Sequence, residues 1–523
     1  MAEEQSKNFT RRKFLRVAGL SAASVAVLAA CGETATPAVT TSSATTAAAT
    51  SAAAMTTSVA AATTSAAAMT SAAGAVTAGG AMTTAPAVIN GAGKTLTVAF
   101  IGDQAGADKR SAVLPGFLQK IPGLQVKFLP VAAKDWNEFF SKILSMKASG
   151  TTPDIVSVAT EGSQNFAAKG LSTALDDYVK RDKAALMDYF SDVNPGLVES
   201  MMYNGHLYHM PDTFNAVMMY VNMNVANAAG VTIPDNWDKD QFYDVAKKLV
   251  KKDGNQTSVY GYSWPIRLWG SSVVWMQANG SNILTQDKFP GGDWLWSTFY
   301  KADDPMIKGR AGGIRWGAPK ANDPANVEAL NFLIQMSKEG TSPIIDPGNG
   351  GAMQGSFASG KIGMTPSGGF YVGGLKAAGM GPNAFDIRQF PKWKNQTPQF
   401  GAEGYVIMQD AKDKDLAWEF LKYIVSKDAI LSNKNVQANT TTAARRSILT
   451  EAKYAPTGPK SWKLFYDALD KNPDALPIPA PPQEPQVNDI MNKYISLAMS
   501  GDQDAKTALD NSQKDLEALF KQS

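Results

Sequence analysis

The stretch TLTVAFI, residues 95–101, opens the part of the sequence that decides the fold. Every second residue from Leu96 to Phe100 is apolar, which is the alternation of a half-buried strand. The segment 103–120 that follows is helical in pattern and contains Pro115, which we expect to bend it. The alternation returns in LQVKF, residues 124–128, and predicts a second strand.

The next segment predicts a second helix and a third strand. Asp135 and Glu138 in the sequence DWNE have the spacing of a capping box, and apolar residues then recur at helical intervals up to Gly150. The sequence IVSV, residues 155–158, has the form of a short buried strand. Alternating strands and helices at this spacing indicate a parallel sheet with right-handed crossovers.

Polar residues follow two of these strands. Ligands of open sheets bind beyond the carboxyl ends of the strands. Asp103 and Gln104 come directly after the first strand, and Glu161 comes shortly after the third. These three residues are therefore the first candidates for ligand contacts.

Length and composition narrow the class of protein. At 523 residues the chain is too long for one hydrophobic core, so we expect two domains. Lys and Arg (50) nearly balance Asp and Glu (47), and the net charge of +3 argues against nucleic acid as a partner. With one cysteine, Cys31, the chain forms neither an intrachain disulfide nor a cysteine-built zinc site. His206 and His209 lack other convincing ligands, and we expect no metal and no cofactor.

Residues 1–30 have the layout of an export signal. A basic segment, TRRKFLR at 10–16, precedes an uncharged run that ends at Ala30 and is shorter than the roughly 20 residues of a membrane-spanning helix. The paired Arg11 and Arg12 are similar to a twin-arginine signal. LAAC at 28–31 resembles a bacterial lipobox, whose cysteine is lipidated and becomes the first residue of the mature protein. We therefore predict an extracytoplasmic protein, lipid-anchored to the outer face of the cell membrane through Cys31; the alternative is a plain cleaved signal.

Residues 31–93 are predicted to form a disordered tether. From Thr34 to Gly93 the sequence is almost entirely Ala, Thr, Ser, Gly, Met, Val and Pro, without a charged or aromatic residue. Such a composition cannot bury a core. A coil of about 60 residues has a root-mean-square span of roughly 40 Å, which suits a domain that moves above a membrane.

Several segments in the rest of the chain resemble family 1 extracellular solute-binding proteins, the sugar-binding components of ABC importers. The segments are NFAAKGL (165–171), LDDYV (175–179), YNGHLY (203–208), MYVN (219–222), FASGKIGM (357–364) and AWEFLKY (417–423). Each is weak alone, but their order and spacing are fairly specific, and the similarity extends from about Leu96 to Leu449. The sequence departs from the family in the Trp-rich stretch 289–316, which is longer than expected, and at Phe370, where many members have Trp.

The resemblance implies an α/β, two-lobe fold of the periplasmic-binding-protein type, each lobe a mainly parallel sheet flanked by helices. Mapped onto this chain, the N-terminal lobe is 94–213 plus 369–416, and the C-terminal lobe is 214–368 plus 417–523. The implied ligand is a small polar solute, most often a saccharide, held in a cleft between the lobes. The implied partners are the transmembrane permease subunits and cytoplasmic ATPase of an importer, and we expect a monomer.

Aromatic and charged residues near the expected cleft complete the set of candidates. Sugars offer hydroxyl groups and apolar C–H faces, so their sites combine hydrogen-bonding groups with aromatic rings. The segment YSWPIRLW (262–269) and the residues that follow it provide rings and a guanidinium group, and glycine-rich segments at the expected second and third crossovers provide more. The candidates from these segments are Trp264, Arg267, Trp275, Phe370, Tyr371, Glu403 and Tyr405.

Two other classes of function stay open at this stage. An exported carbohydrate-active enzyme would need two carboxylates about 5–10 Å apart across one cleft, a role for which Glu161 and Glu403 are available. A protein that presents its ligand to a membrane sensor would have the same sequence features as a transport component. The sequence leaves the ligand open among monosaccharides, oligosaccharides, polyols and phosphorylated polyols.

Overall fold

The computed structural model describes residues 90–522 except 344–349, 397, 438–440 and 451–457. The predicted signal peptide, Cys31 and nearly all of the predicted tether lie outside the described residues. Within those residues, no helix is both long enough and apolar enough to cross a bilayer.

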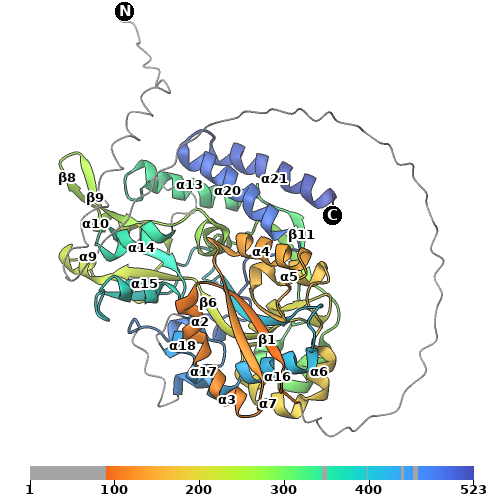
Figure 1. Cartoon of the computed structure of the whole chain (residues 1–523). Helices are drawn as coiled ribbons and strands as arrows, with labels where there is room; N and C mark the ends of the chain where they lie inside the picture. Colours follow the sequence, from red (N-terminus) through yellow and green to blue (C-terminus); the bar gives the residue numbers. More distant parts are fainter. Residues whose placement is uncertain (1–89, 344–349, 397, 438–440, 451–457, 523) are drawn as a thin grey trace, which may run out of the picture. The chain divides into compact units, whose positions relative to one another are not determined.

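The first lobe is built on a six-stranded sheet with the strand order β15-β6-β14-β3-β1-β2 (Figure 1). The strands are β1 (Thr95–Ile101), β2 (Gln125–Val131), β3 (Ile155–Ala159), β6 (Met210–Ala216), β14 (Phe400–Ile407) and β15 (Thr442–Ala443). β1 pairs in parallel with β2 and β3, as the sequence predicts, whereas β14 runs antiparallel to β3 and β6. The sheet is therefore mixed. β6 runs in the same direction as β1, β2 and β3, because β3 and β6 are both antiparallel to β14, and the expectation of a mainly parallel sheet fails for β14 and β15, which run in the opposite direction.

The helices of the first lobe begin at the residues that the sequence indicates. The first predicted helix is two helices, α2 (Gln104–Ser111) and α3 (Leu114–Leu118), and Pro115 lies in the first turn of α3. α4 (Trp136–Ala148) is capped by the Asp135 side chain, which accepts a hydrogen bond from the Glu138 backbone N–H at 2.8 Å. The Glu138 carboxylate accepts from the Lys134 N–H instead of completing a capping box at Asp135.

The second lobe is built on a five-stranded sheet with the order β13-β7-β12-β9-β8. Its strands are β7 (Met218–Asn222), β8 (Lys251–Asp253), β9 (Gln256–Tyr262), β12 (Ile362–Ser367) and β13 (Phe385–Arg388). Of their pairings, only that of β12 with β9 is parallel, so this sheet is not mainly parallel either. α10 (Lys239–Leu249) packs directly on β9 because Gly261 has no side chain: a Cβ there would lie 1.8 Å from the Ala246 carbonyl oxygen.

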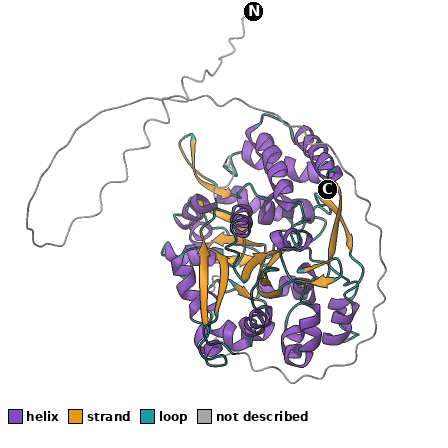
Figure 2. Ribbon diagram, turned by 45° about the vertical axis from the view of Figure 1, so that its right-hand side comes forward, coloured by secondary structure: helices purple, strands orange, loops and turns teal. Residues whose placement is uncertain are grey.

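Helices flank the strands of both sheets (Figure 2). In the second lobe, α20 (Glu484–Ser500) and α21 (Ala505–Lys521) pack on each other and on α13 (Pro324–Lys338), burying Val487, Met491, Ile495 and Leu509 (Figure 1). The longer remaining elements are α5 (Thr160–Ala168), α6 (Asp176–Arg181), α7 (Lys183–Asp192), α8 (Pro195–Ser200), α9 (Met223–Ala228), α11 (Val273–Ala278), α12 (Asp293–Phe299), α14 (Gly350–Ala358), α15 (Tyr371–Ala377), α16 (Lys414–Ile424), α17 (Lys427–Ser432) and α19 (Leu464–Asp470). Two short antiparallel pairs complete the fold: β4 (Met202–Tyr203) with β5 (His206–Leu207), and β10 (Leu284–Lys288) with β11 (Ile314–Pro319).

Among the described residues, three segments connect the lobes: Val217 between β6 and β7, residues 389–396 and 398–399 between β13 and β14, and residues 471–483 between α19 and α20. The pairing of two strands places them in the opposite lobe from the one that the predicted boundaries give. β13 lies within 369–416 but pairs with β7 of the second lobe, and β15 lies within 417–523 but pairs with β6 of the first. The predicted second crossover at 368–371 instead leads into α15, and the predicted third, at 401–405, is part of strand β14.

The Trp-rich insertion, residues 289–316, packs against the first lobe, although it directly follows strand β10 of the second lobe in the sequence. Phe299 of α12 packs on Phe190 of α7, with ring centroids 4.3 Å apart. Glu199 of α8 is fully buried beneath the insertion. Its carboxylate accepts hydrogen bonds from Lys288 Nζ at 2.6 Å, Arg310 Nη1 at 2.7 Å and the Ala311 N–H at 2.9 Å. The insertion is thus fastened to the first lobe by a buried ion pair.

Candidate functional site

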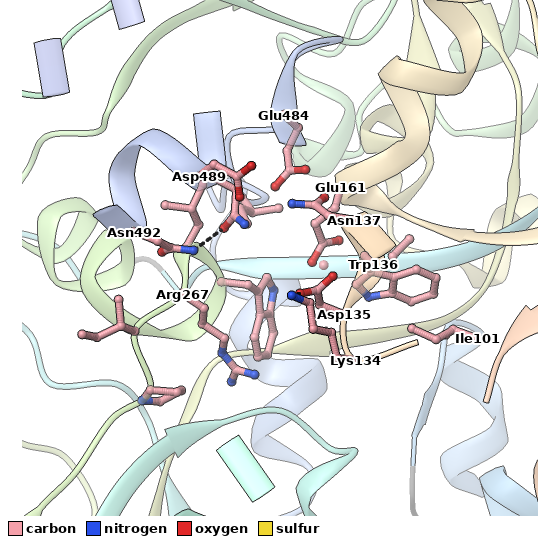
Figure 3. A pocket seen from close by; sticks show the side chains of 18 of the residues that line it. Ile101, Lys134, Asp135, Trp136, Asn137, Glu161, Arg267, Glu484, Asp489 and Asn492 are labelled. Carbon is pink, nitrogen blue, oxygen red and sulfur yellow. Dashed lines mark hydrogen bonds and ion pairs between the residues drawn. The ribbon is translucent and has the colours of Figure 1, made fainter. Parts of the chain in front are cut away.

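A cavity of about 820 Å³ lies between the two lobes (Figure 3). Its wall is formed by the six-stranded sheet of the first lobe, by residues 265–269 after β9, and by helix α20. Residues of the first lobe that line it include Ile101, Asp135, Trp136, Asn137, Glu161, Asn215 and Glu403. Residues of the second lobe and of the crossing segments include Arg267, Trp269, Phe370, Glu484, Asn488, Asp489, Asn492, Lys493 and Ser496. Its volume is within the range of about 300–1,000 Å³ that is usual for small-molecule pockets.

The first-lobe wall is formed where the parallel strands end. Ile101 is the last residue of β1, Asp135 caps α4 in the connection after β2, and Glu161 lies in the first turn of α5 directly after β3. Because β1, β2 and β3 are parallel, these positions share one edge of the sheet. This arrangement is the one expected for ligand binding beyond the carboxyl ends of strands.

α20 forms the opposite wall with one face. Glu484, Asn488, Asn492 and Ser496 follow one another at intervals of four residues, so they point in the same direction from the helix. The Nδ2 atom of Asn492 donates to Oδ1 of Asn488 at 3.0 Å, whereas Oδ1 of Asn492 is buried without a hydrogen-bond partner among the described residues. The helix therefore presents a polar strip to the cavity.

The aromatic end of the cavity is formed by Trp269 and Phe370. Their ring centroids are 5.6 Å apart at an interplanar angle of 52°, and the Arg267 guanidinium carbon lies 5.4 Å from the Trp269 ring centroid and 5.8 Å from that of Phe370. Phe370 is 41% exposed, an unusual state for so large an apolar side chain. Gly401 makes room for the indole, since a Cβ there would lie 3.0 Å from Trp269 Nε1.

The acidic end of the cavity contains Glu161 and Glu484. Burial raises the pKa of Glu161 to about 7, an effect that Glu403 strengthens and Arg267 opposes. The pKa of Glu484 is raised well above its ordinary value, first by burial and then by the charges of Glu161, Asp489 and Asp135. Figure 3 shows the side chains of Glu161, Glu484 and Asp135 directed into the same part of the cavity. The carboxylates of Glu161 and Asp135 therefore make ionisation of Glu484 less favourable.

Glu403 connects the cavity to a buried network in the first lobe. Burial raises the pKa of Glu403, against the opposing charge of Arg110. Burial and Glu403 also raise the pKa of Asp212 to about 7. Arg110 Nη1 donates to the Tyr405 hydroxyl at 3.2 Å. Tyr405, predicted as a ligand contact, thus belongs to this network and does not line the cavity.

Arg267 is the basic side chain of the aromatic end. Burial lowers its pKa to about 10, although Glu161 and Tyr371 oppose the effect. Its Nε atom is buried without a hydrogen-bond partner among the described residues. The guanidinium is therefore held by the two rings and by the longer-range attraction of Glu161.

Four of the ten predicted contact residues line the cavity: Glu161, Arg267, Phe370 and Glu403. Asp103 does not, because its carboxylate caps α2 by accepting from the Gly106 N–H at 2.8 Å. Nor does the exposed Gln104, which donates to Asp108 at 2.9 Å.

The remaining three predicted contacts belong to the core of the second lobe. Trp264 and Trp275 are fully buried, and Trp275 Nε1 donates to the Tyr262 hydroxyl at 2.9 Å. Tyr371 is 4% exposed and packs edge-on against Tyr220, with centroids 5.1 Å apart. None of the three lines the cavity.

Comparisons with known proteins agree with this geometry. A family model described as bacterial extracellular solute-binding protein matches residues 101–430. A curated relative from Agrobacterium fabrum, the sn-glycerol-3-phosphate-binding periplasmic protein UgpB, is 24% identical over 404 residues, 72% of this chain and 77% of the relative.

Two solved structures illustrate the similarity of fold. An ABC substrate-binding protein from Listeria monocytogenes, in complex with cycloalternan, is 21% identical with a TM-score of 0.66 and covers 82% of this chain and 99% of its own. The GacH receptor of Streptomyces glaucescens, solved unliganded and with acarbose, is 19% identical with a TM-score of 0.63. The match covers 82% of this chain and 98% of the receptor chain. At these identities the structures support the two-lobe fold and not a particular ligand.

Proposed function

The chain belongs to the bacterial extracellular solute-binding proteins, and from this premise we propose that it captures a sugar or oligosaccharide between its lobes and delivers it to an ABC-type import permease with a cytoplasmic ATPase. The observation that carries the proposal is the cavity of about 820 Å³, to which both lobes contribute hydrogen-bonding side chains and which ends in an aromatic pair. The solved relatives bound to cycloalternan and acarbose support a saccharide as the class of ligand.

The chemistry of the cavity suits a hydroxyl-rich guest. The faces of Trp269 and Phe370 can lie against the C–H surface of a sugar ring, while Asn137, Asn215 and Asn492 can donate to and accept from hydroxyl groups. Oδ1 of Asn215 and Oδ1 of Asn492 are buried without a hydrogen-bond partner among the described residues, so a hydroxyl donor would satisfy them.

Binding to both lobes supplies the proposed mechanism. A ligand that bonds to Glu161 of the first lobe and to Arg267 or Asn492 of the second binds the closed arrangement more tightly than the open one. The population of closed protein then rises by that difference in affinity, and the permease distinguishes the two shapes. No covalent step is part of this mechanism.

Phe370 gives the first test. Phe370→Ala removes a ring that is already 41% exposed, so we expect the stability of the fold to change by less than about 0.5 kcal/mol. Saccharide affinity should fall about 3- to 10-fold, because one apolar wall is lost. The affinity is measured by calorimetry with the sugar that gives the largest thermal shift among maltose, maltotriose, cellobiose and acarbose.

Met187→Ala is the matched control, since Met187 is 43% exposed on α7 and does not line the cavity. It should leave the affinity unchanged. Equal affinities of the Phe370 variant and the wild type would contradict the proposed position of the sugar, and the absence of any thermal shift would contradict the saccharide itself.

Anchoring through Cys31 is part of the proposal. In cells, the wild-type chain should incorporate radiolabelled palmitate and sediment with membranes, whereas Cys31→Ser should lose the label and be released. Equal labelling of the two proteins would exclude lipidation at this residue. Release of the unlabelled variant together with retention of the wild type would also place the protein outside the cytoplasm.

One observation favours a second candidate, a carbohydrate-cleaving enzyme. Glu161 and Glu403 line the same cavity, and each has a raised pKa, as a general acid would need. Family membership favours binding without cleavage. Incubation of the protein with the sugars of the panel, followed by chromatography, separates the two: new reducing ends that disappear in Glu161→Gln would establish hydrolysis.

A further inference from the structure

The acidic end of the cavity contains more negative charge than its surroundings balance. The acidic side chains that line the cavity are Asp135, Glu161, Glu403, Glu484 and Asp489, against the basic Lys134, Arg267 and Lys493. Of the three basic groups, Lys134 is paired with one of these acids, Asp135, and Lys493 is engaged with partners outside the cavity lining, so neither balances Glu161, Glu403, Glu484 or Asp489. Lys134 Nζ lies 3.9 Å from Asp135, and Lys493 Nζ lies 3.1 Å from the Tyr494 hydroxyl and 3.5 Å from Asp515.

Glu484 shows the imbalance most clearly. Its side chain is 2% exposed, and its Oε2 atom is buried without a hydrogen-bond partner among the described residues. The charged groups that act on it are Glu161 of α5, Asp489 of α20 and Asp135 of the α4 cap, and all three are acidic. In the described part of the chain, no ion pair within 4.0 Å involves Glu161, Glu403, Glu484 or Asp489. A buried carboxylate in this state is costly unless a donor approaches it.

We propose that the cavity selects a saccharide bearing a protonated amine, whose ammonium group donates hydrogen bonds to Glu161 and Glu484 while the sugar ring lies against Trp269 and Phe370. This inference rests on the proposed function and specifies its substrate class. An ammonium group has three N–H donors and a positive charge, so it satisfies both carboxylates at once. A phosphate or carboxylate at this end would face Glu161, Glu484, Asp489 and Asp135, and it is disfavoured by like-charge repulsion.

A neutral sugar is the competing ligand. Burial raises the pKa of Glu161 to about 7, so this carboxyl is partly protonated near neutral pH, and a protonated carboxyl group can exchange hydrogen bonds with a hydroxyl. The two ligands differ in their effect on protons. An ammonium group lowers the pKa of the facing carboxyls and so releases protons on binding, whereas a hydroxyl group favours the protonated form and causes no release.

The experiment compares three disaccharides with the same linkage and different 2-substituents: the chitosan disaccharide with free amines, N,N′-diacetylchitobiose and cellobiose. Calorimetry of the full-length protein at pH 6.5 should show about tenfold tighter binding of the chitosan disaccharide than of cellobiose. Repeating the titration at pH 5.5 in acetate and in Mes, where the amines are already protonated in solution, should show proton release with the aminated sugar alone.

Two variants assign the preference to residues. Glu484→Gln and Glu161→Gln keep the shape of the side chain and remove its charge, so each should reduce the preference for the aminated sugar to less than about threefold. Glu517→Gln is the control, because it removes the same charge from an exposed position on α21 outside the cavity, and it should keep the full preference. Melting curves of the three variants establish that each is folded.

The outcomes separate the inference from the proposed function. Binding of cellobiose or maltose as tight as, or tighter than, that of the aminated sugar overturns the inference and leaves the proposed function intact. A preference that survives in both Glu484→Gln and Glu161→Gln also overturns it. If neither the three disaccharides nor maltose, maltotriose and acarbose bind, the saccharide function itself fails.

Discussion

Replacing Glu199 by alanine is expected to lower the free energy of unfolding by about 3–5 kcal/mol. The Glu199 carboxylate is fully buried, and the Arg310 side chain that it holds is only 8% exposed. Removing the carboxylate leaves that guanidinium without its counter-ion and the Ala311 N–H without its acceptor. Since a buried charge that loses its partner keeps its full cost of desolvation, the loss is much larger than for a surface ion pair.

Urea denaturation of the wild type and of Glu199→Ala measures the effect. The control is Asp287→Ala, which breaks the pair between Asp287 and Arg315 on the exposed face of β10 and β11. Those side chains are 69% and 52% exposed, so the control should change stability by less than about 1 kcal/mol. Comparable losses in the two variants would show that the insertion is not fastened through Glu199.

The ion pair between Glu199 and Arg310 also gives the Trp-rich insertion a structural role. Phe299 and Glu199 connect the insertion to α7 and α8 of the first lobe, while its flanking strands β10 and β11 pair next to α21 of the second. In addition, Gln164 Nε2 of α5 donates to the Ile314 carbonyl at 2.6 Å. The insertion therefore contacts both lobes, and Glu199→Ala should increase the susceptibility of residues 289–316 to proteolysis.

Local patterns in the sequence predict the first half of the six-stranded sheet well. The alternation in 95–101 gives β1 its bounds, and Asp135 marks the start of α4, because strand periodicity and helix capping depend on residues that are close in sequence. The place of β14 between β3 and β6 could not be predicted in this way. It depends on pairs such as Glu403 with Thr213, which are nearly two hundred residues apart.

The site was harder to predict because core and pocket aromatics have the same sequence signature. Trp264, Trp269 and Trp275 lie within twelve residues, yet only Trp269 lines the cavity, and the other two fill the core of the second lobe. The polar face of α20 carries a signal, since Glu484, Asn488, Asn492 and Ser496 recur every four residues. A solvent-facing helix has the same spacing, and only the crossing segment 471–483 places this face at the cavity.

The unliganded protein should lose stability as the pH rises from about 4.5 to 7, in part because of Glu161. The folded state holds the Glu161 proton up to a pKa of about 7, whereas the unfolded chain releases it near 4.5. A group whose pKa is higher in the folded state stabilises the fold fully below the unfolded value, and that stabilisation is lost as the pH rises through the folded value. The window of the effect is therefore pH 4.5 to 7.

Glu161→Gln removes this pH dependence and should be more stable than the wild type at pH 8 by about 1–3 kcal/mol. One pKa unit corresponds to about 1.4 kcal/mol, and water in the cavity reduces the free energy that the pKa shift of Glu161 would otherwise give. At pH 4.5 the two proteins should be nearly equal, because the wild-type carboxyl is then largely protonated in the folded state. Urea denaturation at both pH values measures the difference, with Glu517→Gln as the control for the loss of one charge. A variant that is equally or less stable than the wild type at pH 8 would show that Glu161 is not strained in the free protein. In the expected case, ionisation of Glu161 lowers the stability of the unliganded protein. A cationic ligand removes this cost by pairing with the carboxylate, so the same free energy contributes to the binding affinity.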